Sequence, residues 1–195
     1  MNRSLFTVAA LCAVLATPAF AHTGAGPVSG LLAGFGHPIG GLDHMLAMVA
    51  VGVLAVQQGG KSLWFVPAAF VAMMIVGGLL GMGAFPLPFV EAGIVGSVVV
   101  LGAVIALGRQ MPMGVAMALA GAFALFHGHA HGTEMPVDAS GLSYGLGFAI
   151  ATLLLHGAGI GLTMGIQKFV AQRGPLAVRI SGGAIAAAGA ALVAA

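Results

Sequence analysis

Charged side chains are scarce in this sequence. Asp, Glu, Lys and Arg together account for 5% of the 195 residues, whereas hydrophobic residues account for 60%. Ordinary soluble domains carry about 25% charged residues, so this composition excludes that class and predicts an integral membrane protein surrounded by the lipid bilayer. Six Lys and Arg residues against four Asp and Glu residues form no basic surface, which excludes nucleic acid as a partner.

Cysteine is almost absent as well, and the one that exists, Cys12, lies in a segment that we expect to be removed. Arg3 opens this segment, an apolar run follows, and "AFA" at 19–21 matches the small-x-small pattern of a cleavage site. The sequence therefore predicts a signal peptide at 1–21 and a membrane domain at 22–195. A domain without cysteine has no disulfide, thiolate metal site or cysteine nucleophile. An uncleaved first helix is the alternative.

Signatures of catalysis are missing too. The chain has neither the H-E-x-x-H pattern of zinc proteases nor the nucleotide-binding loop G-x-x-x-x-G-K-[ST]. "GLSYG" at 141–145 matches the hydrolase elbow G-x-S-x-G, but that elbow requires a strand-to-helix turn, whereas here the motif opens an apolar segment. We therefore expect no enzyme. An intramembrane protease that uses Ser143 and His156 is the remaining catalytic alternative.

Long apolar segments fill most of the sequence. Each is close to the ~20 residues that a helix needs to cross the hydrocarbon core. The pattern predicts an all-α integral membrane protein with six transmembrane helices after the cleaved signal peptide. Small residues at four-residue spacing in the fifth span, Gly157, Gly161 and Gly165, predict a contact between helices. The predicted spans are 41–58, 62–82, 87–108, 111–128, 141–166 and 176–195.

Charges divide between the two ends of these spans. If the cleaved amino terminus lies outside, the loops that face the cytoplasm hold every cation of the mature chain. This distribution follows the positive-inside rule. The acidic residues and most histidines fall at the opposite ends, so we expect the outer face to carry the chemistry. The cations are Lys61, Arg109, Lys168, Arg173 and Arg179.

The segment "GHPIGGLDHMLAM" at 36–48 places His37, Asp43 and His44 at the mouth of the first span. Ionisable groups there are costly unless they face the bundle interior and have partners. Imidazole nitrogens and carboxylate oxygens are ligands that nickel, cobalt, zinc and copper accept, so we interpret the three residues as a metal site. Taken singly, Asp43 is also explained as a helix-start carboxylate and His44 as a packing histidine.

A second polar cluster, "FHGHAHGTEMP", follows the fourth span and contains His127, His129, His131 and Glu134. If this segment is helical, His127, His131 and Glu134 share one face, at offsets of four and seven residues. Two interspersed glycines weaken the helix assumption, and a hydrated histidine-rich loop is the alternative. Clusters of this composition are typical of metal binding. We include His129 in the candidate set and expect its replacement to have a mild effect.

Three isolated residues complete the candidate set. Glu91 lies near the start of the third span, where it is also explained as a carboxylate at headgroup level. His156 lies some fifteen residues into the fifth span, about 20 Å deep, where it is either a stop for an ion or an imidazole bonded between helices. Cleavage after Ala21 would make His22 the first residue, so that its amine and ring could chelate one metal.

The two motifs resemble those of the HupE/UreJ family, small membrane permeases associated with nickel supply to hydrogenase and urease. The resemblance rests on "HPIGGLDHMLAMVAVG" and "FHGHAHGTEMP" and spans the mature chain. It implies a permease domain at 22–195 that takes up divalent nickel, or cobalt, from the periplasm. The residues that match the family motifs are His37, Asp43 and His44 in the first, and His127, His131 and Glu134 in the second.

The same resemblance implies a bacterial inner membrane location, and signal cleavage together with the placement of the cations predicts a mature amino terminus in the periplasm. It implies no prosthetic group, Ni2+ or Co2+ as the transported ligand, and nickel-enzyme maturation proteins as downstream partners; a homo-oligomer stays open. Two other classes of function also stay open. One is a metal sensor or accessory subunit that binds at the outer face without transport, and the other is an electron-transfer protein whose His44, His127 or His156 ligates haem.

Overall fold

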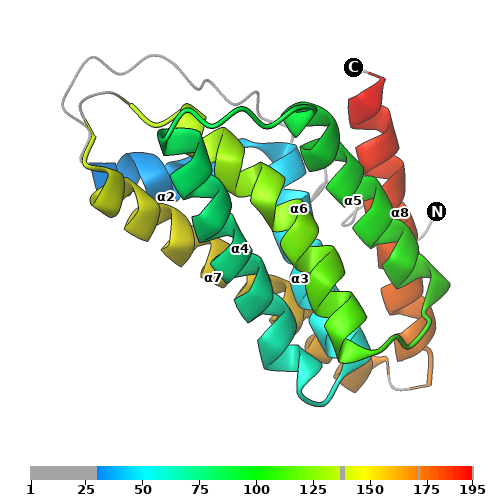
Figure 1. The fold of residues 1–195 in the computed structure, drawn as a ribbon. Coiled ribbons are helices and arrows are strands. Elements are labelled where there is room, and N and C mark those ends of the chain that lie inside the picture. Colours follow the sequence, from blue (N-terminus) through cyan, green and yellow to red (C-terminus); the bar gives the residue numbers. More distant parts are fainter. Residues whose placement is uncertain (1–29, 137–138, 171, 195) are drawn as a thin grey trace, which may run out of the picture.

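The fold is a bundle of helices, seen in a computed structural model that describes residues 30–136, 139–170 and 172–194 (Figure 1). These residues form helices and short connections, with no strand among them, which confirms the all-α prediction. The predicted signal peptide and His22 lie outside the described residues. The helices are α2 (Gly30–Gly40), α3 (Leu42–Gln58), α4 (Ser62–Met82), α5 (Val90–Leu107), α6 (Met113–Thr133), α7 (Gly141–Phe169) and α8 (Gly174–Val193).

Five of these helices, α4 to α8, are individually long and apolar enough to cross a membrane. The helices α2 and α3 pass the same test only as a pair, and the two axes are bent by 82° at their junction. The chain is therefore a multi-pass membrane protein with five crossings, or six when the bent pair is one crossing. The helix α2 was not predicted, because the first span was expected to begin at residue 41.

The bend between α2 and α3 has a local cause. Gly41 is extended, with φ −97° and ψ 120°, and therefore interrupts the helical path. The next residues restart the helix at once, since the Met45 amide donates to the Gly41 carbonyl at 2.9 Å. Asp43 lies in the first turn of α3, where the helix dipole favours a negative charge. The bend lets His37 and His44, which lie on either side of it, approach the same space.

Close helix pairs organise the rest of the bundle. The helix α4 packs along α6, α5 along α8, and both α2 and α3 along α7. A Cβ added at Gly128 would collide with the Met74 carbonyl oxygen, and one added at Gly132 with the Gly78 carbonyl oxygen. Glycine therefore allows the backbones of α4 and α6 to touch, which is how membrane helices associate where apolar burial gives no drive.

Two predictions about helices are corrected by this packing. The fourth span was expected to end at 128, but α6 continues to Thr133, because its glycines are held against α4. The predicted contact stripe at Gly157, Gly161 and Gly165 was wrong within the described chain, since a Cβ added at any of the three meets nothing within 4 Å. On α7 the close approaches are made instead by Gly147, against the Leu31 carbonyl of α2, and by Gly159, against the Val49 carbonyl of α3.

The cations lie together at one end of the bundle, as the order of spans and loops in the sequence predicted. Lys61 precedes α4, Arg109 follows α5, and Lys168 lies in the last turn of α7. Hydrogen bonds tie this end together, since the Gln58 side chain donates to the Arg109 carbonyl at 3.1 Å and the Gln110 side chain donates to the Gln57 carbonyl at 2.8 Å. The bundle therefore has a cationic end, and the histidine motifs lie at the opposite end.

Candidate metal site

Four histidine rings from three helices form one cluster at the end of the bundle opposite the cations. His131 of α6 lies between His37 of α2 and His44 of α3, with ring centroids 4.5 Å from each. The His44 ring also contacts that of His127, at 4.7 Å, and lies 6.4 Å from that of His37. The two sequence motifs, about ninety residues apart, therefore build one site. We call His37, His44, His127 and His131 the outer cluster.

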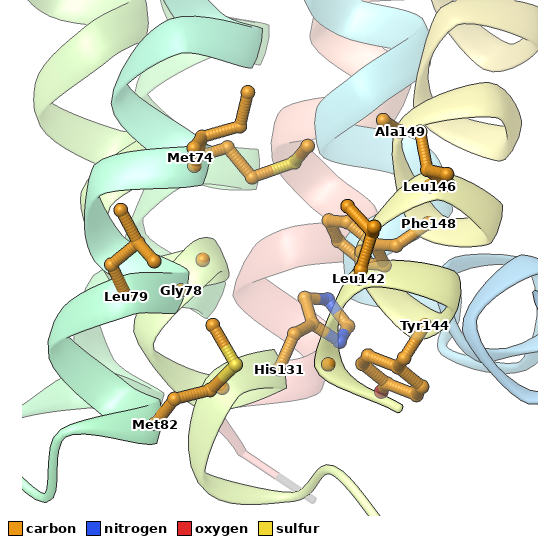
Figure 2. Close-up of a pocket in the computed structure, with 15 residues that line it drawn as sticks. Met74, Gly78, Leu79, Met82, His131, Leu142, Tyr144, Leu146, Phe148 and Ala149 are labelled. Carbon is orange, nitrogen blue, oxygen red and sulfur yellow. The ribbon is translucent and has the colours of Figure 1, made fainter. Parts of the chain in front are cut away.

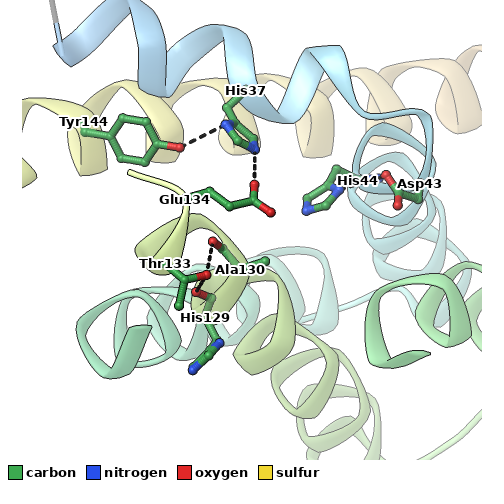
Figure 3. A network of polar contacts seen from close by, with 8 residues as sticks. All are labelled: His37, Asp43, His44, His129, Ala130, Thr133, Glu134 and Tyr144. Carbon is green, nitrogen blue, oxygen red and sulfur yellow. Dashed lines mark hydrogen bonds and ion pairs between the residues drawn. The ribbon is translucent and has the colours of Figure 1, made fainter. Parts of the chain in front are cut away.

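Asp43 supports His44 from behind. The Asp43 carboxylate accepts the His44 backbone amide at 2.7 Å and contacts the His44 ring at Nδ1, at 2.8 Å. Nδ1 therefore carries the proton in the matching tautomer, and Nε2 has the lone pair. His44 Nε2 is buried and has no partner among the described residues. A carboxylate behind the ring is the usual way to orient a metal-binding histidine. Figure 3 shows Asp43 on the side of His44 away from Glu134.

His37 is held by two partners. Its Nε2 lies 3.0 Å from a Glu134 carboxylate oxygen, and its Nδ1 lies 3.1 Å from the Tyr144 hydroxyl (Figure 3). In the matching tautomer, Nε2–H donates to Glu134 while Tyr144 donates to Nδ1. Glu134 is half exposed, so it is the part of the site most open to the outside. Sequence reasoning missed Tyr144, although it is the chain's single tyrosine and opens a membrane helix.

His127 is the most deeply buried ring of the outer cluster, with no exposed surface. Ser97 of α5 donates its hydroxyl to the Ile94 carbonyl at 2.5 Å, so it accepts from His127 Nε2 at 2.9 Å. This contact leaves the lone pair of His127 on Nδ1, which is buried without a partner in the described chain. Ser97 was also missed, and a serine in an apolar helix was the signal that could have found it.

His131 differs from its neighbours because neither of its ring nitrogens has a hydrogen-bond partner among the described residues. The residue is 3% exposed, and its ring packs against Phe148 at 3.8 Å between centroids. It also lines a cavity of about 420 Å³ between α4, α6 and α7, which Figure 2 shows with Tyr144 and Phe148 close to the ring. An unpaired buried polar group costs about 1–3 kcal/mol, so this arrangement calls for an explanation.

Two candidates lie apart from the cluster. His129 Nε2 donates to the Phe85 carbonyl at 2.8 Å, which ties α6 to the loop before α5, and Figure 3 shows its ring pointing away from Glu134. Glu91 is exposed in the first turn of α5, and no hydrogen bond described for this part of the chain joins it to a histidine. Neither residue is brought into the outer cluster.

His156 lies deeper, as its position in the sequence indicated. The residue is 1% exposed, and neither ring nitrogen has a partner among the described residues. Its ring meets that of Phe70 edge-on, with centroids 5.1 Å apart, and the same Phe70 ring lies 5.8 Å from that of His127. Phe70 therefore separates the outer cluster from His156.

The cluster supplies ligand atoms without a ready-made coordination sphere. The described residues contain no group of three or more His, Cys, Asp or Glu side chains already placed to hold one ion. Because the rings meet edge to face, their nitrogens do not converge on one point. Side chains must rotate before an ion is bound by several of them. Weak or incomplete coordination of this kind suits an ion that has to leave again.

The geometry also bears on the alternatives. Ser143 and His156 lie thirteen residues apart on the continuous helix α7, which separates them by about 20 Å along its axis. A serine–histidine pair within this chain is therefore not formed, and the protease does not agree with the structure.

Comparisons with known proteins agree with the resemblance of the two histidine motifs. A family model described as "HupE / UreJ protein" matches residues 9–192. A protein named "Protein HupE" from Rhizobium leguminosarum bv. viciae is 46% identical over 182 residues, which cover 93% of this chain and 94% of that protein. No solved structure matches the chain.

Proposed function

This chain belongs to the HupE/UreJ family, and on that premise we propose that it is a permease that takes up divalent nickel, or cobalt, through the outer cluster. The ion is substrate rather than cofactor, and no chemical conversion is needed. The cluster would face the periplasm, in a bacterial inner membrane, because the cations lie at the opposite end of the bundle. Proteins that insert nickel into enzymes would receive the ion on the cytoplasmic side.

One observation carries this proposal. The outer cluster holds buried imidazole nitrogens on His44, His127 and His131 that have no partner among the described residues, from two helices that the chain brings together. Neutral imidazole is the ligand that borderline divalent metals accept best, and thiolate is not available in the mature domain. A permanent packing role would favour satisfied nitrogens, because each unpaired buried group destabilises the fold. An incoming cation would satisfy them.

The entry route follows from the exposure of the residues. Glu134 is the most exposed ionisable group at the site, with 53% of its side chain accessible, and its charge attracts a hydrated cation. The ion then replaces Glu134 at Nε2 of His37, in the tautomer whose Nδ1–H donates to the Tyr144 hydroxyl, and exchanges water for nitrogen of His131 and His44. Asp43 keeps the His44 lone pair directed into the cluster. His156 is the next group with free nitrogens further inward.

The driving force needs no nucleotide. Two positive charges that move inward through an inside-negative potential gain about 4.6 kcal/mol per 100 mV, since each charge gains about 2.3 kcal/mol. This is enough for accumulation across the membrane. Proton-coupled uptake would depend differently on the membrane potential, so the experiment below distinguishes the two driving forces.

The test is uptake of radiolabelled nickel into proteoliposomes that contain the purified chain alone. We expect saturable uptake that rises with an inside-negative potential, and competition by cobalt stronger than by magnesium. His131→Gln should reduce uptake at least tenfold, as loss of groups around a metal costs about 10–100-fold. His129→Gln is the matched control, because it lies on the same helix outside the cluster. Nickel binding without flux would instead favour a sensor or accessory subunit.

A further inference from the structure

Two methionine sulfurs meet in the interior of the bundle, below the outer cluster. Met48 of α3 and Met74 of α4 place their Sδ atoms 3.4 Å and 3.6 Å from the hydroxyl oxygen of Thr152 on α7. All three residues are buried, with exposures of 0%, 3% and 0%. A hydroxyl has one hydrogen, so Thr152 donates to one sulfur at a time and leaves the lone pairs of the other uncommitted.

The deep histidine belongs to the same region. His156 follows Thr152 by four residues on α7, so the two side chains share a helix face with about 5–6 Å between their Cβ atoms. On α4, Phe70 precedes Met74 by the same interval, and Phe70 contacts His156 just as Met74 contacts Thr152. The helices α4 and α7 therefore run antiparallel here, with Phe70 level with His156 and Met74 level with Thr152. The thioethers lie one helical turn to the outer side of His156.

We propose that Met48, Met74 and His156 form a second, inner metal-binding site with two thioether ligands and one imidazole ligand. This proposal rests on the permease function and specifies where an ion stops after the outer cluster. His156 contributes nitrogens that are more than nine-tenths buried and unpartnered among the described residues. The sulfurs come from two other helices, so the site joins α3, α4 and α7.

The ligand chemistry of this inner site selects among metals. Thioether sulfur is a soft ligand, and imidazole suits nickel, copper and zinc, whereas magnesium, calcium and manganese prefer oxygen. The outer cluster offers nitrogen, and Glu134 beside it offers oxygen. The inner site offers only nitrogen, sulfur and one hydroxyl. A hard cation that enters would lose the oxygen ligands of its hydration water and find few oxygen ligands in exchange. Discrimination therefore increases as the ion moves inward.

A physical connection joins the two sites. Met74 and His131 both line the cavity between α4, α6 and α7, and Figure 2 shows both side chains at this cavity. An ion at His131 therefore lies next to a space that reaches the thioether of Met74. Methionine commonly fills gaps in apolar cores, but packing alone does not explain why two sulfurs from separate helices share a hydroxyl beside an unpartnered histidine.

The experiment is X-ray absorption at the nickel edge on purified protein loaded with nickel(II) chloride. Wild-type protein should show sulfur neighbours of nickel. The four histidines of the outer cluster have no sulfur, but Met82 also lines the cavity beside His131, so the double variant decides which sulfurs bind nickel. The Met48→Leu/Met74→Leu double variant conserves volume and should lose this sulfur signal. Met73→Leu is the matched control, because Met73 adjoins Met74 in sequence but packs against Gly121, and it should keep the signal.

Thr152→Val separates a ligand role from a structural one. It removes the hydroxyl but leaves both sulfurs, so the sulfur signal should persist. If the methionines acted only by bonding to Thr152, this variant would copy the double variant. In proteoliposomes the double variant should lose about tenfold in nickel uptake while keeping nickel binding at the outer cluster.

Failure of this inference and of the permease function give different results. Absence of nickel flux in the wild type would contradict the permease function, whatever the spectra show. A wild-type spectrum without sulfur, or a sulfur signal that persists in the double variant, would overturn the inner site even if flux is normal. Normal chromatographic behaviour of each variant in detergent ensures that loss of signal is not loss of fold.

Discussion

Tyr144 and His37 lie 107 positions apart in the sequence, yet the Tyr144 hydroxyl and His37 Nδ1 are 3.1 Å apart. This contact ties the start of α7 to α2 at the outer cluster. It also fixes which nitrogen of His37 faces Glu134. A hydroxyl that no sequence motif singled out therefore sets the orientation of a candidate ligand.

Tyr144→Phe removes this hydroxyl and keeps the ring. His37 loses the partner that holds Nδ1 while Nε2 faces the metal, so its ring is less well placed for a metal. We expect the nickel concentration for half-maximal uptake to rise about tenfold, the lower end of what loss of a supporting partner costs. Uptake kinetics in proteoliposomes measure it. Ser143→Ala, one residue earlier on α7, is the control and should leave uptake unchanged; equal effects of both changes would contradict the proposed contact.

Asp43→Ala and His44→Ala should each abolish nickel uptake at normal levels of the protein in the membrane. In the proposed site His44 would supply a ligand nitrogen, and Asp43 holds the other nitrogen of the ring. His129→Ala should be mild, because His129 contacts the Phe85 carbonyl and not the cluster. Uptake assays with immunoblots of the membrane fraction test this order. Full activity in all three variants would remove the cluster from consideration.

Gly41→Ala tests whether the bend between α2 and α3 makes room for the acid–histidine pair. A Cβ at Gly41 would lie 2.9 Å from the Asp43 carboxylate and 3.1 Å from His44 Nδ1, so the pair must shift. We expect nickel uptake to fall about tenfold, as for loss of a supporting partner. Gly40→Ala is the control, because a Cβ there meets nothing within 4 Å. A comparable loss in both variants would point to the helix bend itself rather than to the pair.

Gly128→Ala should destabilise the protein through the contact between α4 and α6. The added Cβ collides with the Met74 carbonyl oxygen, which is backbone and cannot rotate away. Overpacking of this kind costs about 1–3 kcal/mol. Gly114→Ala on the same helix has open space and should be neutral or stabilising, by up to about 1 kcal/mol, because alanine favours helix. Thermal unfolding in detergent, followed by circular dichroism, compares the two; equal stability would contradict the close contact.

The spans were predictable because apolar length alone defines them. The helix α2 was not, since its eleven residues contain Pro38 and end in glycine, which read as a loop. What makes it helical is packing along α7, a tertiary effect invisible in the local pattern. The extension of α6 to Thr133 was not predicted for the same reason. The glycines of α6 weaken an isolated helix, but they allow close contact with α4.

The candidate site was predictable as a set and not as an arrangement. The motifs identified His37, His44, His127 and His131, and the fold brings them together. The spacing could not reveal that Asp43 lies behind His44, because this depends on one side-chain rotamer. Tyr144 and Ser97 were missed because a single hydroxyl in an apolar helix is a weak signal, and its contact with a histidine ring is seen only in the fold.

The bend at Gly41 also determines whether the number of membrane crossings is odd or even. Counting α2 and α3 as one crossing makes six, an even number, which returns the carboxyl end of α8 to the face of the membrane where α2 begins. Figure 1 shows the carboxyl end and α2 at the same end of the bundle. Reporter domains attached before α2 and after α8 would then share one compartment. Under the proposed function, a tag added at the carboxyl terminus would therefore lie on the side from which the metal enters.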